Sequence, residues 1–213
     1  ATFMPKPLQG VPGSAMFLYE SLLDHKGENL FWAPKSSHPA HLSVLAQHYV
    51  AGLLKYAPEF MLITNPTVNS YKRFDRESIP SHTTWGRNNR AALVRIPAHK
   101  PGKHIATRAE LLNPDPCANP YLALAATLMA GLKGIEEELE LPAEYEGGDP
   151  AEYGEALPTT LGEALVRFKG SELMRETLGD HVFTYLCERK EEEWRKSCIA
   201  VTDWDRMKYY AGV

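Results

Sequence analysis

The segment that decides how this chain is read covers residues 65–121. It contains NPTVNSYKRF at 65–74, WGRNNRAALVRIP at 85–97 and TRAELLNPDPCANPY at 107–121. Residues that favour turns, namely Asn, Gly and Pro, separate the arginines of these three runs, which are Arg73, Arg87, Arg90, Arg95 and Arg108. This pattern predicts loops and short strands that bring guanidinium groups together.

A guanidinium group is always charged and offers two parallel donors to a phosphate or a carboxylate. The segment therefore predicts an arginine-lined site for one of these anions. The alternative, on spacing alone, is that the arginines are scattered over the surface.

The composition is that of a globular chain with a slightly acidic charge. Of the 213 residues, 44% are hydrophobic, which is enough for one sizeable core, and the formal net charge is −4. This charge argues against a broadly basic nucleic-acid surface, and no apolar run approaches the roughly 20 residues that a membrane span needs. The first residues also lack the basic and then apolar build of a signal peptide. We therefore expect a cytoplasmic protein with no nucleic-acid or membrane partner.

The three cysteines are Cys117, Cys187 and Cys198. An odd and sparse set argues against a disulfide framework and favours a reducing compartment. None of them stands at ligand spacing from another cysteine or a histidine, so a cysteine metal site is not expected.

Two stretches have the apolar spacing of helices. The first is expected to begin at Pro39 and to end before Pro58, with apolar positions at Leu42, Leu45, Ala46, Tyr49, Leu53 and Leu54. The second is expected to follow Asn119, a favourable N-cap, with Pro120 as its first residue. Its apolar stripe, which we expect to face the core, comprises Tyr121, Leu124, Leu128, Leu132, Ile135 and Leu139.

The rest of the chain predicts a few strands and a helical tail. Aromatic residues favour a strand at 17–19, the polar run 24–29 a hairpin loop, and the Gly-, Pro- and Glu-rich run 142–158 a surface loop. Helix-cap and helix-stop residues follow, namely Thr160 with Glu163, Gly170, Gly179, Asp180, and Thr202 with Asp205. The expected fold class is α+β, in which antiparallel strands carry the arginines, the two helices back them, and the carboxy-terminal part is helical.

Four runs of this sequence resemble the catalytic domain of type I glutamine synthetases. They are ATFMPKPLQGVPGS at 1–14, NPTVNSYKR at 65–73, the NxR and RIP pattern that ends at 97, and the R-x-E run that continues to NPDPCANPYLA at 108–123. The resemblance covers nearly the whole chain and implies the glutamine synthetase / guanido kinase catalytic fold. It also implies that residues 1–213 are the carboxy-terminal portion of such a domain, without its amino-terminal domain and the first part of its catalytic domain.

The same resemblance implies an ATP-dependent ligase. Enzymes of this family join glutamate to ammonia through an acyl phosphate, with Mg²⁺ or Mn²⁺, in a homo-oligomer whose active sites lie between subunits. The implied substrates are small molecules, namely an amino acid or related acid and ammonia or an amine.

Site residues can be carried over position by position. The resemblance implies that Arg73 binds the substrate carboxylate, and that Arg90 and Arg95 contact the ATP phosphates and the transferred phosphoryl group. It also implies that Glu110 is a metal ligand. Arg108, Ser21 and Tyr19 would lie near the nucleotide. A flexible loop with a catalytic glutamate is one residue shorter here, so this role falls on Glu77 or on Ser78 beside it.

Three positions depart from the family pattern. Phe17 stands where the family has a metal-binding histidine, Tyr19 where it has a second histidine, and Leu112 where it has an arginine for the substrate carboxylate. Phenylalanine and leucine cannot supply these contacts. Two hypotheses follow: a ligase that uses a different acid or amine, or a homologue that has lost ligase activity and is kept for binding or assembly. For the 213 residues alone we expect little or no turnover.

Overall fold

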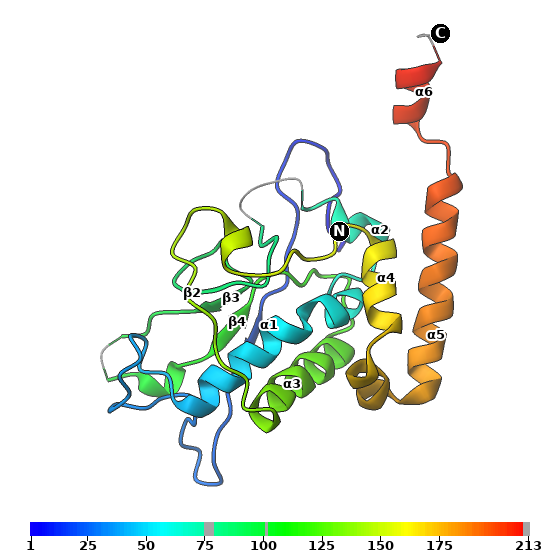
Figure 1. Cartoon of the computed structure of the whole chain (residues 1–213). Coiled ribbons are helices and arrows are strands. Elements are labelled where there is room, and N and C mark those ends of the chain that lie inside the picture. Colours follow the sequence, from blue (N-terminus) through cyan, green and yellow to red (C-terminus); the bar gives the residue numbers. More distant parts are fainter. Residues whose placement is uncertain (75–78, 101, 211–213) are drawn as a thin grey trace.

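The structure is a computed structural model that describes residues 1–74, 79–100 and 102–210. Figure 1 shows a small sheet with two long helices across it, and further helices beside them. Within the described part, four short strands form one sheet in the order β1-β4-β3-β2. The strands are β1 (Leu18–Glu20), β2 (Trp85–Arg87), β3 (Val94–Ile96) and β4 (Ala109–Leu111).

The sheet is mixed, which corrects the expectation of antiparallel strands throughout. β4 pairs antiparallel with both β1 and β3, whereas β2 runs parallel to β3. A short turn normally joins antiparallel strands. Here the chain leaves β2 at Asn88, which has a left-handed backbone with φ of 56°, and loops back to enter β3 in the same direction. The α+β class itself is confirmed.

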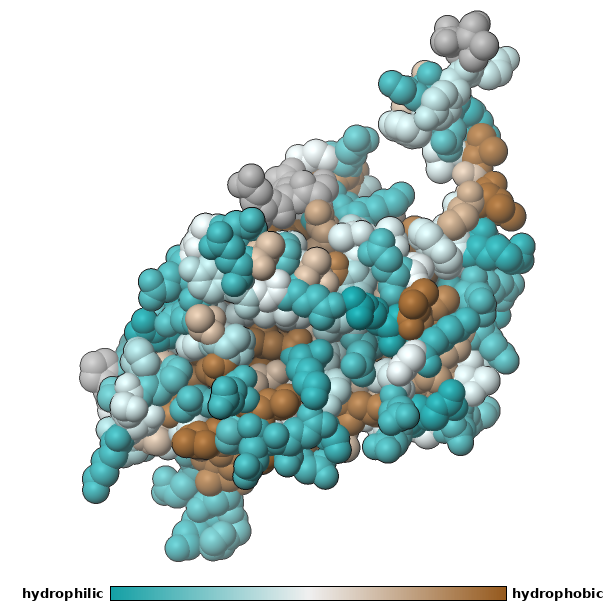
Figure 2. All heavy atoms as spheres, viewed as in Figure 1, coloured by the Kyte–Doolittle hydropathy of each residue, from teal (hydrophilic) through white to brown (hydrophobic). Residues whose placement is uncertain are grey.

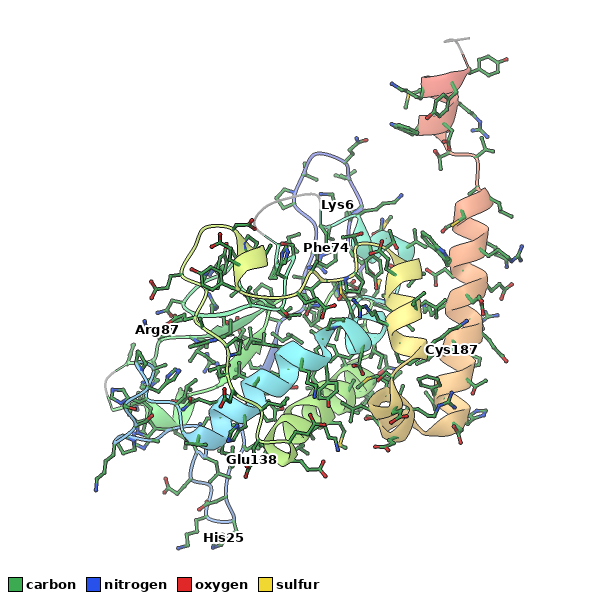
Figure 3. All side chains as sticks on the ribbon, viewed as in Figure 1. Lys6, His25, Phe74, Arg87, Glu138 and Cys187 are labelled. Atoms are coloured by element: carbon green, nitrogen blue, oxygen red, sulfur yellow. The ribbon has the colours of Figure 1, made fainter. Side chains whose placement is uncertain are left out.

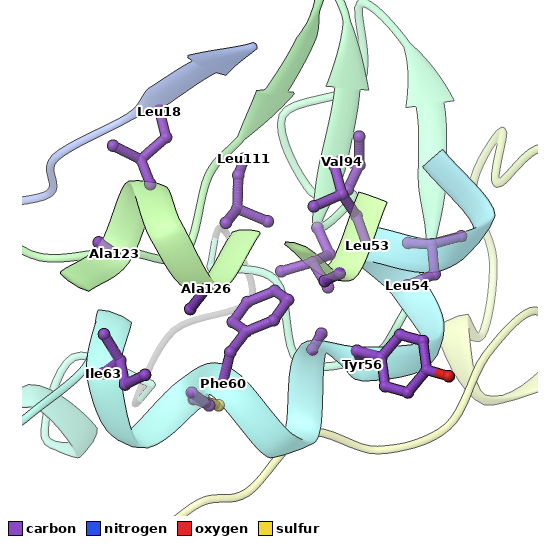
Figure 4. Packing of buried hydrophobic residues seen from close by; sticks show 14 of the residues in the cluster. Leu18, Leu53, Leu54, Tyr56, Phe60, Ile63, Val94, Leu111, Ala123 and Ala126 are labelled. Carbon is purple, nitrogen blue, oxygen red and sulfur yellow. The ribbon is translucent and has the colours of Figure 1, made fainter. Parts of the chain in front are cut away.

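Strand alternation divides the sheet into an apolar and a polar face. Leu18, Val94 and Leu111 are buried on the side of the helices, as Figure 4 shows for their packing toward Leu53 and Ala126. The other face carries Tyr19, Glu110 and Arg95, which are register partners across β1, β4 and β3. The registers therefore place charged side chains in one row on the face away from the core.

The helices of the described part follow in chain order. They are α1 (Val44–Thr64), α2 (Val68–Tyr71), α3 (Pro120–Glu136), α4 (Leu161–Lys169), α5 (Glu172–Ile199) and α6 (Asp203–Tyr209), with 3-10 turns η1 (His104–Ala106) and η2 (Pro150–Glu152). In the described residues none of them is long and apolar enough to cross a membrane.

Helix α1 begins later and ends later than expected. Ser43 is its N-cap, because the Ser43 hydroxyl accepts from the amide of Ala46, so the helix does not start at Pro39. Pro58 lies inside the helix, which continues to Thr64. An internal proline costs about 3 kcal/mol. The residues beyond it, Phe60 and Met61 among them, are fully buried and offset this cost by staying helical against the core.

Helix α3 begins at Pro120 with Asn119 as its N-cap, as expected, but it faces the core with a different side. Its buried residues are small, namely Ala123, Ala126, Thr127, Ala130, Gly131 and Gly134. The expected stripe points outward, since Tyr121 is 84% exposed and Leu124 is 46% exposed. The prediction that this stripe faces the core was therefore wrong: close approach to α1 requires the small residues at the interface.

The run 142–158 has little regular structure, as expected of a loop, but it is bound to the edge of the sheet. The amide of Tyr145 donates to the carbonyl of Trp85 (2.8 Å), and the indole of Trp85 donates to the carbonyl of Pro142 (2.8 Å). The carboxylate of Glu144 accepts from the amide of Arg87 (2.7 Å). These bonds satisfy edge-strand groups of β2 that would otherwise need water.

The helical tail follows the predicted caps. Thr160 caps α4, and Gly179, at φ of 72°, interrupts α5. Thr202 and Asp205 form the capping box of α6. In Figure 1, α6 projects beyond the rest of the molecule. Figure 2 shows hydrophobic atoms where α5 ends, in agreement with the exposure of Ile199 and Val201.

Candidate active site

A cavity of about 290 Å³ lies against the polar face of the sheet. The amino-terminal loop, the segments around residues 73 and 79–80, and the ends of the strands enclose it. Four cationic side chains line it, namely Lys6, Arg73, Arg90 and Arg95. The structure thus brings together three of the arginines that the sequence singled out, from segments before β2, between β2 and β3, and within β3.

Arg73 is the most buried of these cations, with 2% of its surface exposed. Its guanidinium donates to the carbonyl of Asn113 (3.0 Å) and lies 3.8 Å from the carboxylate of Asp115. Burial lowers the pKa of Arg73, and Asp115 opposes that change. Since the guanidinium is the most basic side-chain group in proteins, Arg73 keeps its charge at neutral pH. It is therefore a fixed cation in the cavity wall.

Gly13 allows the amino-terminal loop to close over Arg73. A Cβ at this position would lie 2.4 Å from the carbonyl of Pro5 and 3.0 Å from Cγ of Arg73. The loop is fastened by a hydrogen bond from the amide of Ser14 to the carbonyl of Pro5 (2.8 Å). A side chain at Gly13 would push this wall of the cavity outward.

Arg95 and Glu110 form an ion pair on the polar face of the sheet. Glu110 is fully buried, and its Oε2 accepts from Nε of Arg95. Its second oxygen, Oε1, has no hydrogen-bond partner among the described residues. Glu110 therefore orients Arg95 toward the cavity and retains one buried acceptor for another group.

Tyr19 and Arg108 lie next to this pair. The guanidinium of Arg108 is 4.9 Å from the centre of the Tyr19 ring, a cation–π contact. The Glu110 carboxylate beside the phenol raises the pKa of Tyr19. Nε of Arg108 is buried without a hydrogen-bond partner among the described residues. Arg108 is not among the residues that line the arginine-lined cavity.

Two other predicted site residues stand apart from this geometry. Ser21 is exposed just after β1 and does not line the cavity. Glu77, with Ser78, lies outside the described residues. Their expected roles stay predictions.

A divalent metal ion does not fit the described residues by themselves. Mg²⁺ requires six oxygen ligands in an octahedron. Glu110 supplies one free buried oxygen, whereas the neighbouring Phe17 has no lone pair to donate. The described residues contain no group of three His, Cys, Asp or Glu side chains that could hold a metal ion. Any metal site would need ligands from elsewhere.

Sequence reasoning missed Lys6 as a site residue. Lys6 is 7% exposed, and its Nζ donates to the carbonyl of Val11 (2.8 Å). Its backbone is fixed to α2, since the amide of Lys6 donates to the side chain of Asn69 (2.7 Å). Figure 3 shows Lys6 on the amino-terminal loop. The FMPKP run that contains Lys6 belongs to a segment that resembles the family, and this was the signal that could have identified Lys6.

The comparisons with known proteins agree with this architecture. The family described as "Glutamine synthetase, catalytic domain" matches residues 1–209. The chain is 40% identical over 220 residues to the glutamine synthetase of Thermus thermophilus, and 43% identical over 220 residues to that of Methanosarcina mazei. The first match covers 99% of this chain and 48% of the relative, the second 98% and 47%.

Solved structures with the same fold agree with these sequence matches. A structure described as "Apo GmaS without ligand" superposes with a TM-score of 0.85 at 34% identity, and covers 99% of this chain and 48% of that one. A GmaS/ADP complex superposes with a TM-score of 0.85 at 32% identity, and covers 98% of this chain and 49% of that one. The chain belongs to the glutamine synthetase catalytic-domain family. It spans about half the length of the curated relatives it matches.

Proposed function

We propose that the complete protein is an ATP-dependent carboxylate–amine ligase that joins glutamate or a related acid to ammonia or an amine. The observation that carries this proposal is the convergence of Arg73, Arg90 and Arg95 on one cavity. Family membership supports the class of reaction. The acid would attack the terminal phosphorus of ATP to give an acyl phosphate and ADP. The amine would then attack the acyl carbon and displace phosphate.

The proposed role of each residue follows from its charge. Arg73, held by Asn113 and Asp115, would bind a carboxylate of the acid. Arg90 and Arg95 would neutralise the charge that develops on the transferred phosphoryl group, a contribution of preorganised cations that is typical of phosphoryl transfer. Glu110 fixes one guanidinium and would offer its remaining oxygen to Mg²⁺ or Mn²⁺ beside ligands from elsewhere in the protein. Tyr19, Ser21 and Arg108 would lie on the nucleotide side.

We further propose that residues 1–213 are the carboxy-terminal portion of the catalytic domain and that the complete protein is a homo-oligomer. The support is that the matched relatives are about twice as long as this chain. Since the described residues lack a metal site of their own, the chain alone is expected to show little turnover.

A second candidate is a homologue that binds ligands or assembles without catalysis. Phe17 and Leu112 favour it, because they stand where the family pattern has a metal-binding histidine and a substrate-binding arginine. A lost metal ligand and a lost cation each reduce transition-state stabilisation by several kcal/mol in typical enzymes.

Phosphate release from ATP by the complete protein, with product detection by mass spectrometry, separates the two candidates. A ligase releases phosphate only when both an acid and an amine are present, and Arg90→Gln lowers the rate by at least about 100-fold. Nucleotide binding without acid-dependent phosphate release, over a panel of acids and amines, would favour the non-catalytic homologue.

A further inference from the structure

The cavity has an apolar wall beside its cations. Phe17 and Leu112 line it together with Ala15 and Ile79. Leu112 is buried, whereas Phe17 keeps 45% of its surface exposed. No carboxylate or imidazole lines the cavity among the described residues. A ligand in this space therefore meets both positive charge and hydrocarbon.

Phe17 and Leu112 leave the paired strands at the same end. β1 and β4 are antiparallel, with Leu18 opposite Leu111. Phe17 precedes Leu18 and Leu112 follows Leu111, so both residues stand just beyond this last pair. Further along, the amide of Met16 donates to the carbonyl of Pro114 (2.9 Å), which keeps the two segments side by side. Both residues line the cavity and supply its largest apolar side chains together with Ile79.

This surface is badly suited to the charged head of an amino acid. An α-ammonium group needs hydrogen-bond acceptors or a carboxylate, and its burial against hydrocarbon is unfavourable. An apolar substituent gains instead, because each buried methylene strengthens binding roughly fourfold. The apolar wall thus discriminates among carboxylic acids by the groups next to the carboxylate, because the carboxylate is common to all of them.

We propose that the acid bound in this cavity carries an apolar group near its carboxylate, with the anion on the arginines and the apolar group packed on Phe17 and Leu112. The inference deepens the proposed function and rests on it for one point, that the ligand is the acid to be activated. It assigns Phe17 and Leu112 as specificity-determining residues.

Calorimetric titration of the 213-residue chain with three acids tests the proposal. Butyrate, 4-phenylbutyrate and glutamate share a carboxylate but differ in what surrounds it. We expect 4-phenylbutyrate to bind at least tenfold more tightly than the other two. The alcohol 4-phenylbutanol, which lacks the anion, should bind at least tenfold more weakly than 4-phenylbutyrate. Arg90→Gln should weaken 4-phenylbutyrate and butyrate alike by about tenfold.

Variants of the apolar wall locate the preference. Phe17→Ser and Leu112→Ala should bring 4-phenylbutyrate and butyrate within about threefold of each other, and Leu112→Arg should favour glutamate. Val166→Ala is the matched control, because Val166 is an exposed apolar residue on α4 that does not line the cavity. Circular dichroism checks that each variant folds. If substitution of the buried Leu112 prevents folding, the Phe17→Ser variant still tests the proposal, because Phe17 is exposed.

Four results would overturn the inference. Three of them are equal affinities for the three acids, a preference that survives Phe17→Ser, and no binding of any acid to either the chain or the complete protein. A complete protein that binds glutamate but not 4-phenylbutyrate also overturns it, since other residues must then cover the wall. Selective binding of 4-phenylbutyrate without ATP-dependent phosphate release would support the inferred acid preference. The same result would contradict the proposed ligase function.

Discussion

Glu20 is a carboxylate on the core side of the sheet, between the helices that cover it. Its oxygens accept from the hydroxyl of Tyr49 on α1 (2.8 Å) and from the hydroxyl of Thr127 on α3. Burial raises the pKa of Glu20, and the two hydrogen bonds lower it by less. The position therefore joins both helices to β1 at the cost of a poorly solvated charge.

The pH dependence follows from the direction of this shift. A folded-state pKa above the unfolded value means that the folded chain holds this proton more tightly. Glu20 therefore reduces stability progressively as pH rises from the unfolded pKa, near 4.3, through the folded pKa. We expect Glu20→Gln, which carries no charge, to gain about 2–4 °C in unfolding temperature relative to the parent between pH 5 and pH 8. Thermal unfolding monitored by circular dichroism measures this change in unfolding temperature. An equal loss of stability of the Glu20→Gln variant at every pH would refute the prediction.

At the same scale, single residues were predicted unevenly. Arg73, Arg90 and Arg95 were selected by resemblance, and the structure places them around one cavity, although their roles stay predictions. Spacing alone did not distinguish them from surface arginines such as Arg87, which pairs with Glu144 instead. Lys6 was missed because its burial depends on a loop that closes only through tertiary contacts with α2.

At the scale of elements, the contact between α1 and α3 depends on glycines. A Cβ on Gly134 would lie 2.3 Å from the carbonyl of His48 and 2.6 Å from Cα of Gly52. A Cβ on Gly131 would lie 2.2 Å from the ring of Tyr49. These distances mean that the two helix backbones touch where the glycines meet.

We predict that Gly134→Ala destabilises the chain by about 2 kcal/mol or more, because overpacking forces two buried helices apart. Chemical denaturation measures the free energy of unfolding. Gly170→Ala is the matched control, since its nearest non-neighbouring atoms would be 3.8 Å from the new Cβ. A Gly134→Ala variant as stable as the control would mean that α1 and α3 do not approach this closely.

The same contact explains why the apolar periodicity of α3 predicted the wrong buried face. Large apolar residues at helical spacing usually mark the buried face. Here Leu124 and Leu128 remain exposed, whereas Ala126 and Ala130 are buried, because the interface selects for small volume. The bounds of α3 were predictable from Asn119 and Pro120, since capping is a local interaction. The passage of α1 through Pro58 was not, because core burial outweighed a local cost.

At the scale of the whole molecule, stability is expected to be uneven. None of the α6 residues is buried, and its side-chain bonds are local, as between Arg206 and Asp203. Helix α1 is buried along most of its length. Local opening needs little free energy where few contacts must break.

Hydrogen exchange measured by mass spectrometry should therefore separate the two helices. We predict that the amides of α6 exchange at least about 1,000-fold faster than those of α1. A second exchange measurement at tenfold higher protein concentration is the control for self-association. Equal protection of α6 and α1 in the dilute chain would contradict the expectation that α6 lacks stabilising contacts.

The fold as a whole was predictable in class but not in sheet topology. Local patterns and the resemblance predicted the α+β class, and the cap residues predicted the helical tail. The parallel pairing of β2 and β3 was not predictable, since it depends on the left-handed turn at Asn88 and on the edge bonds from the 142–146 segment.

The central claim is that Arg73, Arg90 and Arg95 form one anion site. Side-chain NMR of ¹⁵N-arginine-labelled chain, titrated separately with glutamate and 4-phenylbutyrate, tests it most directly. Arg167 and Arg189, which pair with surface glutamates, are internal controls. The account predicts that the Nε–Hε signals of Arg73, Arg90 and Arg95 shift together with one dissociation constant for at least one acid, while the controls stay unchanged. Signals of the three arginines that shift with different constants, or no more than those of the controls, would contradict it.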